Sequence, residues 1–372
     1  MTIDRLLIVG TGAPGGIGRV EQLVAEAVHD PDHSPARESI AIWRRRHPDY
    51  LLMGAIESLA VASPATAGDG PLYVRELVRA IRHVRPTYIL YTHINLARPA
   101  PWLRTLGHPA RYGVWTYGVE VWPRLSWLHR HALSNAAVVM SISHDSVRRT
   151  IETQGAPASR TRLIPLSLPA DMFAAASASG QAREPGRILT VSRLAKTEGG
   201  KNIDRLIAAM ATVRERVPEA KLVVVGDGDD RERMESFARD LGLTKAVDFT
   251  GRISDDELRA QYGRADVFAL PSEKEGFGLV FVEAMLAGTP VVGLAKGGPL
   301  DIIRDGIDGR LLSDVAELED ALASMLADRA VLRQMGGQAQ ARAKTSFSPA
   351  NFRSEFAAAL SADDGAPHRP LP

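Results

Sequence analysis

The sequence contains no cysteine among its 372 residues. This absence excludes disulfides, thiolate metal sites, iron–sulfur clusters and cysteine nucleophiles, and it fits a reducing compartment. No apolar run approaches the roughly 20 residues that a membrane-spanning helix needs. The first residues, Met1–Val9, lack the basic start and the cleavage site of a signal peptide, so we expect a cytoplasmic protein.

Lysine is missing from residues 1–168, which carry 19 arginines and 13 acidic residues, a net charge of +6. Residues 169–372 carry 26 basic and 31 acidic residues, a net charge of −5. Opposite signs predict two domains with different partners. An arginine-rich surface suits anionic lipid, a phosphorylated substrate or nucleic acid. Because neither a Lys-rich tract nor a nucleic-acid motif accompanies it, we expect no nucleic-acid partner.

The order of apolar and amphipathic segments predicts an α/β protein with two Rossmann-like, doubly wound domains. Short β-branched runs alternate with amphipathic stretches, as in parallel sheets that helices cover on both faces. Strands are expected at residues 6–9, 39–43, 88–92, 114–116, 138–142 and 163–166, then at 188–191, 222–225, 247–250, 267–270 and 291–294. Helices are expected at residues 18–28, 74–84, 125–133 and 146–153, then at 203–216, 231–241, 255–262 and 279–287.

The alternation breaks at residues 167–187, which are rich in Ala, Ser, Gly and Pro. We interpret them as a crossing between domains followed by a mobile loop. The predicted domains cover residues 1–168 and 169–345, followed by a helical segment at 346–361 and a disordered tail at 362–372. Two such domains facing each other would place the carboxyl ends of two sheets around one cleft, where open α/β sheets bind ligands.

A glycine-rich turn, residues 10–15, follows the first expected strand and fits the pattern G-x-G-x-x-G. A dinucleotide site of this type also needs an acid after the second strand, to hold the ribose. The second strand runs instead into Arg44-Arg45-Arg46, which disfavours a nicotinamide or flavin enzyme. Two interpretations remain, glycines that only form a tight turn and glycines that approach a phosphate or sugar.

Residues 271–285 carry the strongest signal in the chain. A strand ends there, and a turn with Gly276 and Gly278 leads into an apolar helix. Without side chains at the glycines, the amides of residues 276–279 can approach an anion, and the helix dipole adds to the attraction. Glu283 lies inside the apolar run and needs partners if it is buried. Those partners are either a neighbouring base or ribose hydroxyls.

Arg193 and Lys201 are two cations at positions suited to binding an anion. Arg193 comes directly after the strand at residues 188–191, and Lys201 precedes the helix at 203–216. A cation at a helix N-terminus works against the helix dipole unless an anion offsets it. The pair therefore indicates either a diphosphate site or two solvated surface charges.

These segments resemble the retaining glycosyltransferases of family 4, which have the GT-B fold. Glu275 and Glu283, eight residues apart, look like that family's E-x(7)-E signature. The resemblance covers residues 188–312 and extends more weakly to residues 15–19. It also implies that the final helix, at residues 346–361, crosses back to the N-terminal domain, where the apolar stripe of Phe347, Phe352, Phe356 and Leu360 would pack. The matching segments stand in the family's order at residues 191–194, 225–228, 249–253, 270–272 and 288–292.

The resemblance implies a metal-independent retaining enzyme that takes a nucleoside diphosphate sugar and needs no cofactor. Arg193 and Lys201 would hold the diphosphate, Glu283 the ribose and Glu275 the donor sugar, while the Ile253 backbone would meet the base. The donor-binding set so implied is Gly16, Ile253, Gly276, Phe277, Gly278, Leu279 and Glu283. The set expected to act in catalysis is Glu275, Arg193, Lys201 and His93.

The N-terminal half departs from the family where relatives often read Thr-His-Gly. This chain has Thr116 followed by Tyr117 and Gly118, so the acceptor-side candidates become Tyr117 and Glu120. His93 closes an expected strand and would contact the donor sugar or the acceptor, the alternative being a structural histidine. In the C-terminal half, the usual GG-x-PE appears as residues 297–301, Gly-Gly-Pro-Leu-Asp.

The stretch at residues 117–122 resembles mannosyl- and glucosyltransferases of bacterial exopolysaccharide assembly. It suggests GDP-mannose as donor and a glycan or lipid-linked glycan as acceptor. Two alternatives remain, a sugar-nucleotide epimerase of similar fold and a non-catalytic nucleotide-sugar-binding protein. No pair of histidines and carboxylates has metal-ligand spacing, so we expect no catalytic metal.

Residues 98–131 gather four of the five tryptophans among arginines. Such a stretch is either an interfacial surface that docks on anionic lipid, at the inner face of the cell membrane, or ordinary aromatic core. The residues concerned are Trp102, Trp115, Trp122 and Trp127, with Arg98, Arg104, Arg111, Arg124 and Arg130.

Overall fold

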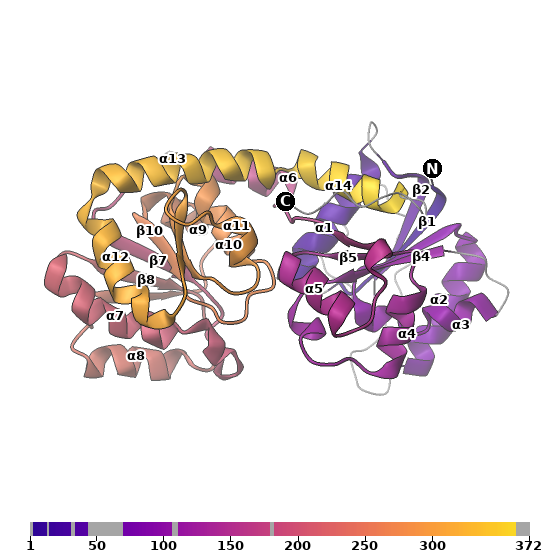
Figure 1. Cartoon of the computed structure of the whole chain (residues 1–372), viewed down its shortest axis with the longest axis horizontal. Helices are drawn as coiled ribbons and strands as arrows, with labels where there is room; N and C mark the ends of the chain where they lie inside the picture. Colours follow the sequence, from indigo (N-terminus) through magenta and orange to yellow (C-terminus); the bar gives the residue numbers. More distant parts are fainter. Residues whose placement is uncertain are drawn as a thin grey trace. The chain divides into compact units, whose positions relative to one another are not determined.

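The computed structural model describes residues 3–12, 15–30, 34–43, 70–105, 111–178 and 182–361. The chain forms two compact units, one from residues 1–169 with 349–372 and the other from residues 170–348. Each unit is built around one parallel six-stranded sheet (Figure 1). The predicted tail at 362–372 and the run Arg44–Arg46 lie outside the described residues.

The first unit has the strand order β2-β1-β3-β4-β5-β6, so the order reverses between β1 and β3. Its strands are β1 (Ile3–Gly10), β2 (Ala36–Trp43), β3 (Tyr88–Tyr91), β4 (Arg111–Thr116), β5 (Val138–Ser141) and β6 (Thr161–Leu163). Its helices are α1 (Gly16–His29), α2 (Gly70–Val84), α3 (Ala100–Thr105), α4 (Trp127–Asn135), α5 (His144–Glu152) and α14 (Pro349–Ser361), with 3-10 turns at η2 (Ile94–Leu96), η3 (Val119–Val121) and η4 (Ala158–Arg160).

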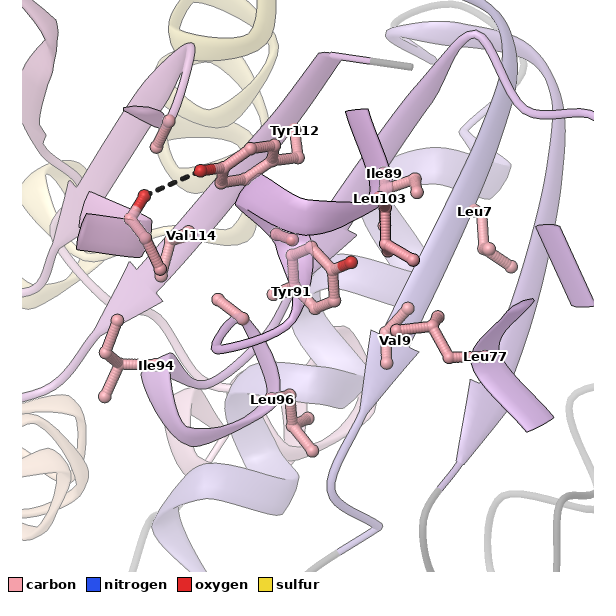
Figure 2. Packing of buried hydrophobic residues seen from close by; sticks show 14 of the residues in the cluster. Leu7, Val9, Leu77, Ile89, Tyr91, Ile94, Leu96, Leu103, Tyr112 and Val114 are labelled. Carbon is pink, nitrogen blue, oxygen red and sulfur yellow. Dashed lines mark hydrogen bonds between the residues drawn. The ribbon is translucent and has the colours of Figure 1, made fainter. Parts of the chain in front are cut away.

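The central strands of this sheet are apolar on both faces. Consecutive residues of β1, Leu6 to Val9, are all buried, which explains why the strand shows no polar alternation. Figure 2 shows one side of this core, where Leu7 and Val9 lie near Ile89 and Tyr91 of the adjacent strand. The α/β prediction for this half of the chain is therefore confirmed.

The C-terminal helix α14 packs on the first unit. The rings of Phe352 and Phe356 stack 5.9 Å apart, and they lie 6.1 and 5.9 Å from the ring of Trp115. Arg353 binds Asp30 at 2.8 Å, which ties the same helix to the end of α1. The fully buried Trp115 thus belongs to a core that the last helix completes.

The second unit has the order β12-β11-β10-β7-β8-β9, which reverses between β7 and β10. Its strands are β7 (Arg187–Val191), β8 (Lys221–Val225), β9 (Val247–Gly251), β10 (Val267–Leu270), β11 (Val291–Leu294) and β12 (Gly309–Leu312). Its helices are α6 (Ala170–Ser177), α7 (Ile203–Arg216), α8 (Arg231–Asp240), α9 (Asp255–Arg264), α10 (Leu279–Leu286), α11 (Pro299–Ile302), α12 (Leu318–Ala327) and α13 (Arg329–Ser346), with 3-10 turns at η5 (Lys196–Lys201) and η6 (Val315–Glu317).

Two local predictions were wrong. Residues 170–177, expected as loop, form α6, because the alanines that suggested a featureless linker are also the strongest helix formers. The strand expected at 163–166 lies instead at Thr161–Leu163. Pro165 has no backbone N–H, so it cannot extend the ladder, although Ile164 and Leu166 are buried.

None of the helices in the described ranges combines the length and the hydropathy needed to cross a bilayer.

Candidate functional site

The strongest sequence signals of the second unit meet at the place where its strand order reverses. β7 and β10 are neighbours in the sheet, and the segments that leave their carboxyl ends are residues 192–202 and 271–278. In open α/β sheets such a reversal leaves a crevice at the carboxyl edge, which is the usual ligand site. Sheet order therefore places the two predicted segments together.

Three contacts hold these segments to each other. The Asn202 side-chain amide donates to the Pro271 carbonyl at 2.8 Å, and the Glu273 amide donates to the Gly200 carbonyl at 2.7 Å. Asn202 can do this because it adopts a left-handed backbone conformation, φ 54°, which Asn tolerates better than most residues. The third contact is an ion pair between two of the sequence-predicted residues.

In that ion pair, Lys201 Nζ lies 2.7 Å from Glu275 Oε2. Both side chains are mostly buried, with 23% and 16% of their surface exposed. A partly desolvated charge interacts more strongly with a ligand than one in bulk water. The pair therefore fixes an ammonium and a carboxylate at the carboxyl edge of the second sheet.

Arg193 stands beside this pair in the chain but has another partner. Its Nε donates to the Glu198 carboxylate at 2.9 Å, and its side chain is 67% exposed. The structure thus pairs the exposed Arg193 with the half-buried Glu198 and does not place it in the Lys201–Glu275 pair. It follows β7 directly, at the carboxyl edge, as its position in the sequence predicted.

Glu283 is buried, as predicted from the apolar run around it, with 5% of its surface exposed. It lies in the second turn of α10 and accepts a hydrogen bond from the Tyr262 hydroxyl at 2.7 Å. Sequence analysis did not identify Tyr262, which comes from α9. A neutral phenol satisfies part of the carboxylate's hydrogen-bonding capacity without cancelling its charge.

The turn between β10 and α10 requires glycine at one position above all. Gly278 has φ 98°, and a Cβ atom there would lie 2.6 Å from the Phe281 ring. Gly276 and Leu279 are partly exposed on either side of it, whereas the Phe277 side chain is buried against Phe347. The turn therefore exposes backbone while its one aromatic side chain anchors it.

Gly297 and Gly298 also contact this turn, and no role was predicted for them from the sequence. The Gly298 amide donates to the Glu275 carbonyl at 2.9 Å. A Cβ atom on Gly297 would lie 2.4 Å from that same carbonyl oxygen, and one on Gly298 would lie 2.2 Å from the Phe277 carbonyl oxygen. The usable signal was the Gly-Gly pair itself, since two backbones can approach this closely only without side chains.

Ile253, predicted to meet the base, comes just after β9 and is half-buried. β9 is two strands away from β7 at the same edge of the sheet.

In the first unit, His93 and the two acceptor-side candidates, Tyr117 and Glu120, lie together after the adjacent strands β3 and β4. The His93 and Tyr117 rings stack with centroids 5.8 Å apart. Glu120 accepts from the Tyr117 and Gly118 amides at 2.5 and 3.0 Å, and the Tyr117 hydroxyl donates to the Thr92 carbonyl at 2.8 Å. Residues that are far apart in the chain therefore form one cluster.

One ring nitrogen of His93 accepts a backbone hydrogen bond, which leaves the other nitrogen able to donate to a ligand. Its Nδ1 accepts from the Asn95 amide at 3.1 Å. Burial lowers the pKa of His93 below its usual value, and the charge of Glu120 acts in the opposite direction. A neutral imidazole that accepts at Nδ1 carries its proton on Nε2, so it can donate a hydrogen bond there.

The glycine-rich turn of the first unit does not present free amides to a phosphate at its start. The Thr11 and Gly12 amides donate to the carboxylate of Glu21, at 2.6 and 3.0 Å. Gly16 is exposed at the first position of α1. Glu21 was missed in the sequence, although an acid at a core-facing position of the helix at 18–28 was a visible signal.

The four tryptophans of residues 98–131 divide between core and surface. Trp115 is buried and Trp122 half-buried, whereas Trp102 and Trp127 expose 50% and 57% of their surface. The exposed pair has ring centroids 6.3 Å apart, and both rings contact His131. The core interpretation is therefore confirmed for Trp115, whereas Trp102 and Trp127 form an exposed aromatic pair.

Within the described ranges, no group of three or more His, Asp and Glu side chains is arranged to hold a metal ion.

Known proteins resemble both the sequence and the fold. Residues 174–342 match the family described as glycosyl transferases group 1. A GDP-mannose-dependent alpha-(1-6)-phosphatidylinositol monomannoside mannosyltransferase of Mycobacterium tuberculosis is 33% identical over 255 residues, which are 63% of this chain and 65% of that protein. The chain thus spans slightly less than two thirds of the length of this relative.

Solved structures match nearly the whole chain at low identity. A glycosyltransferase from Rickettsia africae superposes with a TM-score of 0.78 at 16% identity, over 96% of this chain and 98% of that one. Anabaena Alr3699/HepE, solved with UDP-glucose, gives 0.75 at 20% identity, over 96% and 99%. Residues 174–342 are thus similar to the glycosyl transferases group 1 family, and the two six-stranded units have the GT-B architecture.

Proposed function

We propose that this protein is a retaining glycosyltransferase that transfers a sugar from a nucleoside diphosphate sugar to a glycan or lipid-linked glycan. The observation that carries the proposal is the Lys201–Glu275 pair at the crevice between β7 and β10. Glu275 lies on a glycine-bearing turn, eight residues before the buried Glu283, and this arrangement suits a ligand with both phosphate and hydroxyl groups.

In this proposal the donor diphosphate binds where positive charge and exposed amides converge. Lys201 and Arg193 supply the charges, and the backbone of residues 276–279 supplies N–H groups at the start of α10. Glu275 accepts hydrogen bonds from the donor sugar and Glu283 from the ribose, while the Ile253 backbone meets the base. Charged groups fixed before the reaction stabilise the negative charge that develops on the leaving diphosphate.

The reaction needs only this charge stabilisation and a positioned acceptor. A new bond forms between the anomeric carbon and the acceptor oxygen, and the bond between that carbon and the phosphate oxygen breaks. Attack from the face that the diphosphate leaves keeps the configuration, and a diphosphate oxygen takes the hydroxyl proton. His93, Tyr117 and Glu120 are the acceptor-side groups in this proposal, and they are held together on the first unit.

GDP-mannose is the donor and polysaccharide assembly the process that we propose. The mycobacterial relative is named as GDP-mannose-dependent, and residues 117–122 resemble exopolysaccharide mannosyl- and glucosyltransferases. A panel of GDP-, UDP- and ADP-sugars tests the choice by thermal shift. A ligand at 100 times its Kd stabilises the folded state by about 2.7 kcal/mol. Selective stabilisation by UDP- or ADP-sugars would refute the GDP-mannose proposal.

Activity assays on the same panel separate the competing functions. A transferase releases nucleoside diphosphate and forms a glycoside only when an acceptor is present. An epimerase would isomerise the donor with no acceptor, and a non-catalytic binding protein would show the thermal shift without either product.

Replacing Glu283 by glutamine is expected to raise the Kd for the nucleoside diphosphate about tenfold, because the ribose hydroxyls lose a charged acceptor. Glutamine keeps a carbonyl oxygen for the Tyr262 hydroxyl, so the fold should survive. Isothermal titration calorimetry measures the change, with Glu257→Gln, an exposed acid on α9, as control. An unchanged Kd with a lowered melting temperature would assign Glu283 a structural role only.

We further propose that the exposed pair Trp102 and Trp127 docks the first unit on anionic lipid, so that the protein works at the inner face of the cell membrane. Exposed Arg98 and Arg124 supply positive charge in the same stretch. Aromatic rings favour the lipid headgroup region, and arginines favour anionic headgroups. The relative's name, which includes a phosphatidylinositol mannoside, supports a lipid-linked acceptor.

The double change Trp102→Ser and Trp127→Ser is expected to abolish sedimentation with vesicles of phosphatidylglycerol and phosphatidylcholine. Leu241→Ser with Val331→Ser removes two exposed apolar side chains elsewhere and should leave sedimentation unchanged. Equal binding of the two double variants would refute a docking role for the tryptophans.

A further inference from the structure

The first unit has its own strand-order reversal, between β1 and β3, and a side chain of the protein bridges the segments that follow these two strands. The segments that leave these strands begin at Thr11 and at Thr92. Between them lies the carboxylate of Glu21, which is fully buried. An acid in such a place costs several kcal/mol unless it is well satisfied, which raises the question of what it does there.

Four donors converge on this carboxylate. Its Oε1 accepts from the Thr11 amide at 2.6 Å, the Thr11 hydroxyl at 2.9 Å and the Thr92 hydroxyl at 2.6 Å. Its Oε2 accepts from the Gly12 amide at 3.0 Å. Only a carboxylate offers two acceptor oxygens, because the amide of glutamine would turn an N–H₂ group toward a donor in either orientation.

The same contacts extend to the acceptor-side cluster. Thr92 donates its hydroxyl to Glu21, and its backbone carbonyl accepts the Tyr117 hydroxyl at 2.8 Å. Tyr117 in turn stacks on His93, the residue after Thr92. A continuous set of short contacts therefore joins α1, the glycine-rich turn, β3 and β4.

We propose that Glu21 is a positioning residue, which fixes Thr11 and Gly12 against the end of β3 and so orients His93 and Tyr117 for the acceptor. This inference rests on the proposed transferase function. Burial raises the pKa of Glu21, and the hydrogen bonds from Thr92, Thr11 and Gly12 act in the opposite direction. The donors thus favour the ionised form that all four contacts require.

The test compares Glu21→Gln with Val24→Ala, which removes buried apolar volume from the same helix without removing a hydrogen bond to either segment. Glu21→Gln is expected to lower kcat/KM for transfer about ten- to a hundredfold, the cost of misplacing a reacting group by about 1 Å. The Kd for the nucleoside diphosphate should change far less. Val24→Ala should lower the melting temperature and keep kcat/KM when assayed well below it.

A double-mutant cycle with Thr92→Val gives a second readout. If Glu21 acts through Thr92, the two changes are non-additive in kcat/KM, by about two- to a hundredfold. Thr92→Ser keeps the hydroxyl that Thr92→Val removes, so its kcat/KM should equal that of the wild type. Additive effects, or a Glu21→Gln variant that is destabilised but has wild-type kcat/KM, would overturn the proposal.

Hydrogen exchange of the Thr11 and Gly12 amides tests the same contacts without any assay of transfer. We expect these amides to lose protection in Glu21→Gln and to keep it in Val24→Ala. Retained protection in Glu21→Gln would overturn the proposal even in an inactive protein. A wild-type chain that transfers no sugar would instead refute the proposed function, which makes the two failures distinguishable.

Discussion

Lys201→Ala is expected to lower kcat by about 10²–10³-fold while the fold survives, because it removes a fixed charge from the leaving diphosphate. In the folded protein this ammonium lies 2.7 Å from Glu275 and is mostly buried, so its position costs little reorganisation during the reaction. Steady-state kinetics with the donor identified by thermal shift measures the loss.

The matched control for this change is Lys221→Ala. Lys221 is an exposed lysine at the amino end of β8, so it lies at the opposite edge of the same sheet. The Lys221→Ala change removes one positive charge from the second unit, as Lys201→Ala does, and should leave kcat unchanged. A Lys201→Ala enzyme with full turnover would move the diphosphate site away from the segment at 192–202.

Much of the second unit could be predicted because its local signals agree with its tertiary environment. Strand β8 is buried over four consecutive apolar residues, Leu222–Val225, and α7 has the predicted bounds Ile203–Arg216. Ser254 caps α9 by accepting from the Glu257 amide, and these two residues have the spacing of a capping box. Where propensity, periodicity and capping coincide, sequence alone suffices.

Other elements escaped prediction because their signals are ambiguous or come from elsewhere in the chain. Strand β12, Gly309–Leu312, is short and contains glycine and arginine, and it forms by pairing with β11 at the sheet edge. Helix α3 is also short, and the proline within it masks its pattern. Pairing and packing decide such segments, and neither is visible in a local window.

The candidate site was predicted in its residues but not in its geometry. Lys201 and Glu275 are 74 positions apart, and only the adjacency of β7 and β10 brings them into contact. Arg193 was expected to act with Lys201, but in the structure its guanidinium forms an ion pair with the nearby Glu198. Tyr262 contacts Glu283 from a different helix, and one sequence does not reveal such a contact.

Gly298→Ala is expected to have the second large effect, through the backbone rather than through charge. An added Cβ would lie 2.2 Å from the Phe277 carbonyl oxygen, which belongs to the turn that carries Glu275. Gly298 has φ −58°, so alanine meets no backbone strain there and the cost comes from the clash with the Phe277 backbone. Overpacking of this kind destabilises by about 1–3 kcal/mol. A displaced turn should also lower kcat/KM by about a hundredfold.

Gly337→Ala provides the matched control for the same chemical change in the same unit. Gly337 lies inside α13, and no atom stands within 4 Å of the position its Cβ would take. Alanine there should stabilise the helix by about 0.5–1 kcal/mol and leave kinetics unchanged. Thermal unfolding measures the change in stability of each variant, and kcat/KM measures the change in transfer.

Because a shifted turn moves both the amides of residues 276–279 and the Glu275 side chain, Gly298→Ala should weaken binding of the nucleoside diphosphate as well as transfer. A Gly298→Ala enzyme that keeps wild-type affinity and rate would show that the turn's position does not depend on this contact.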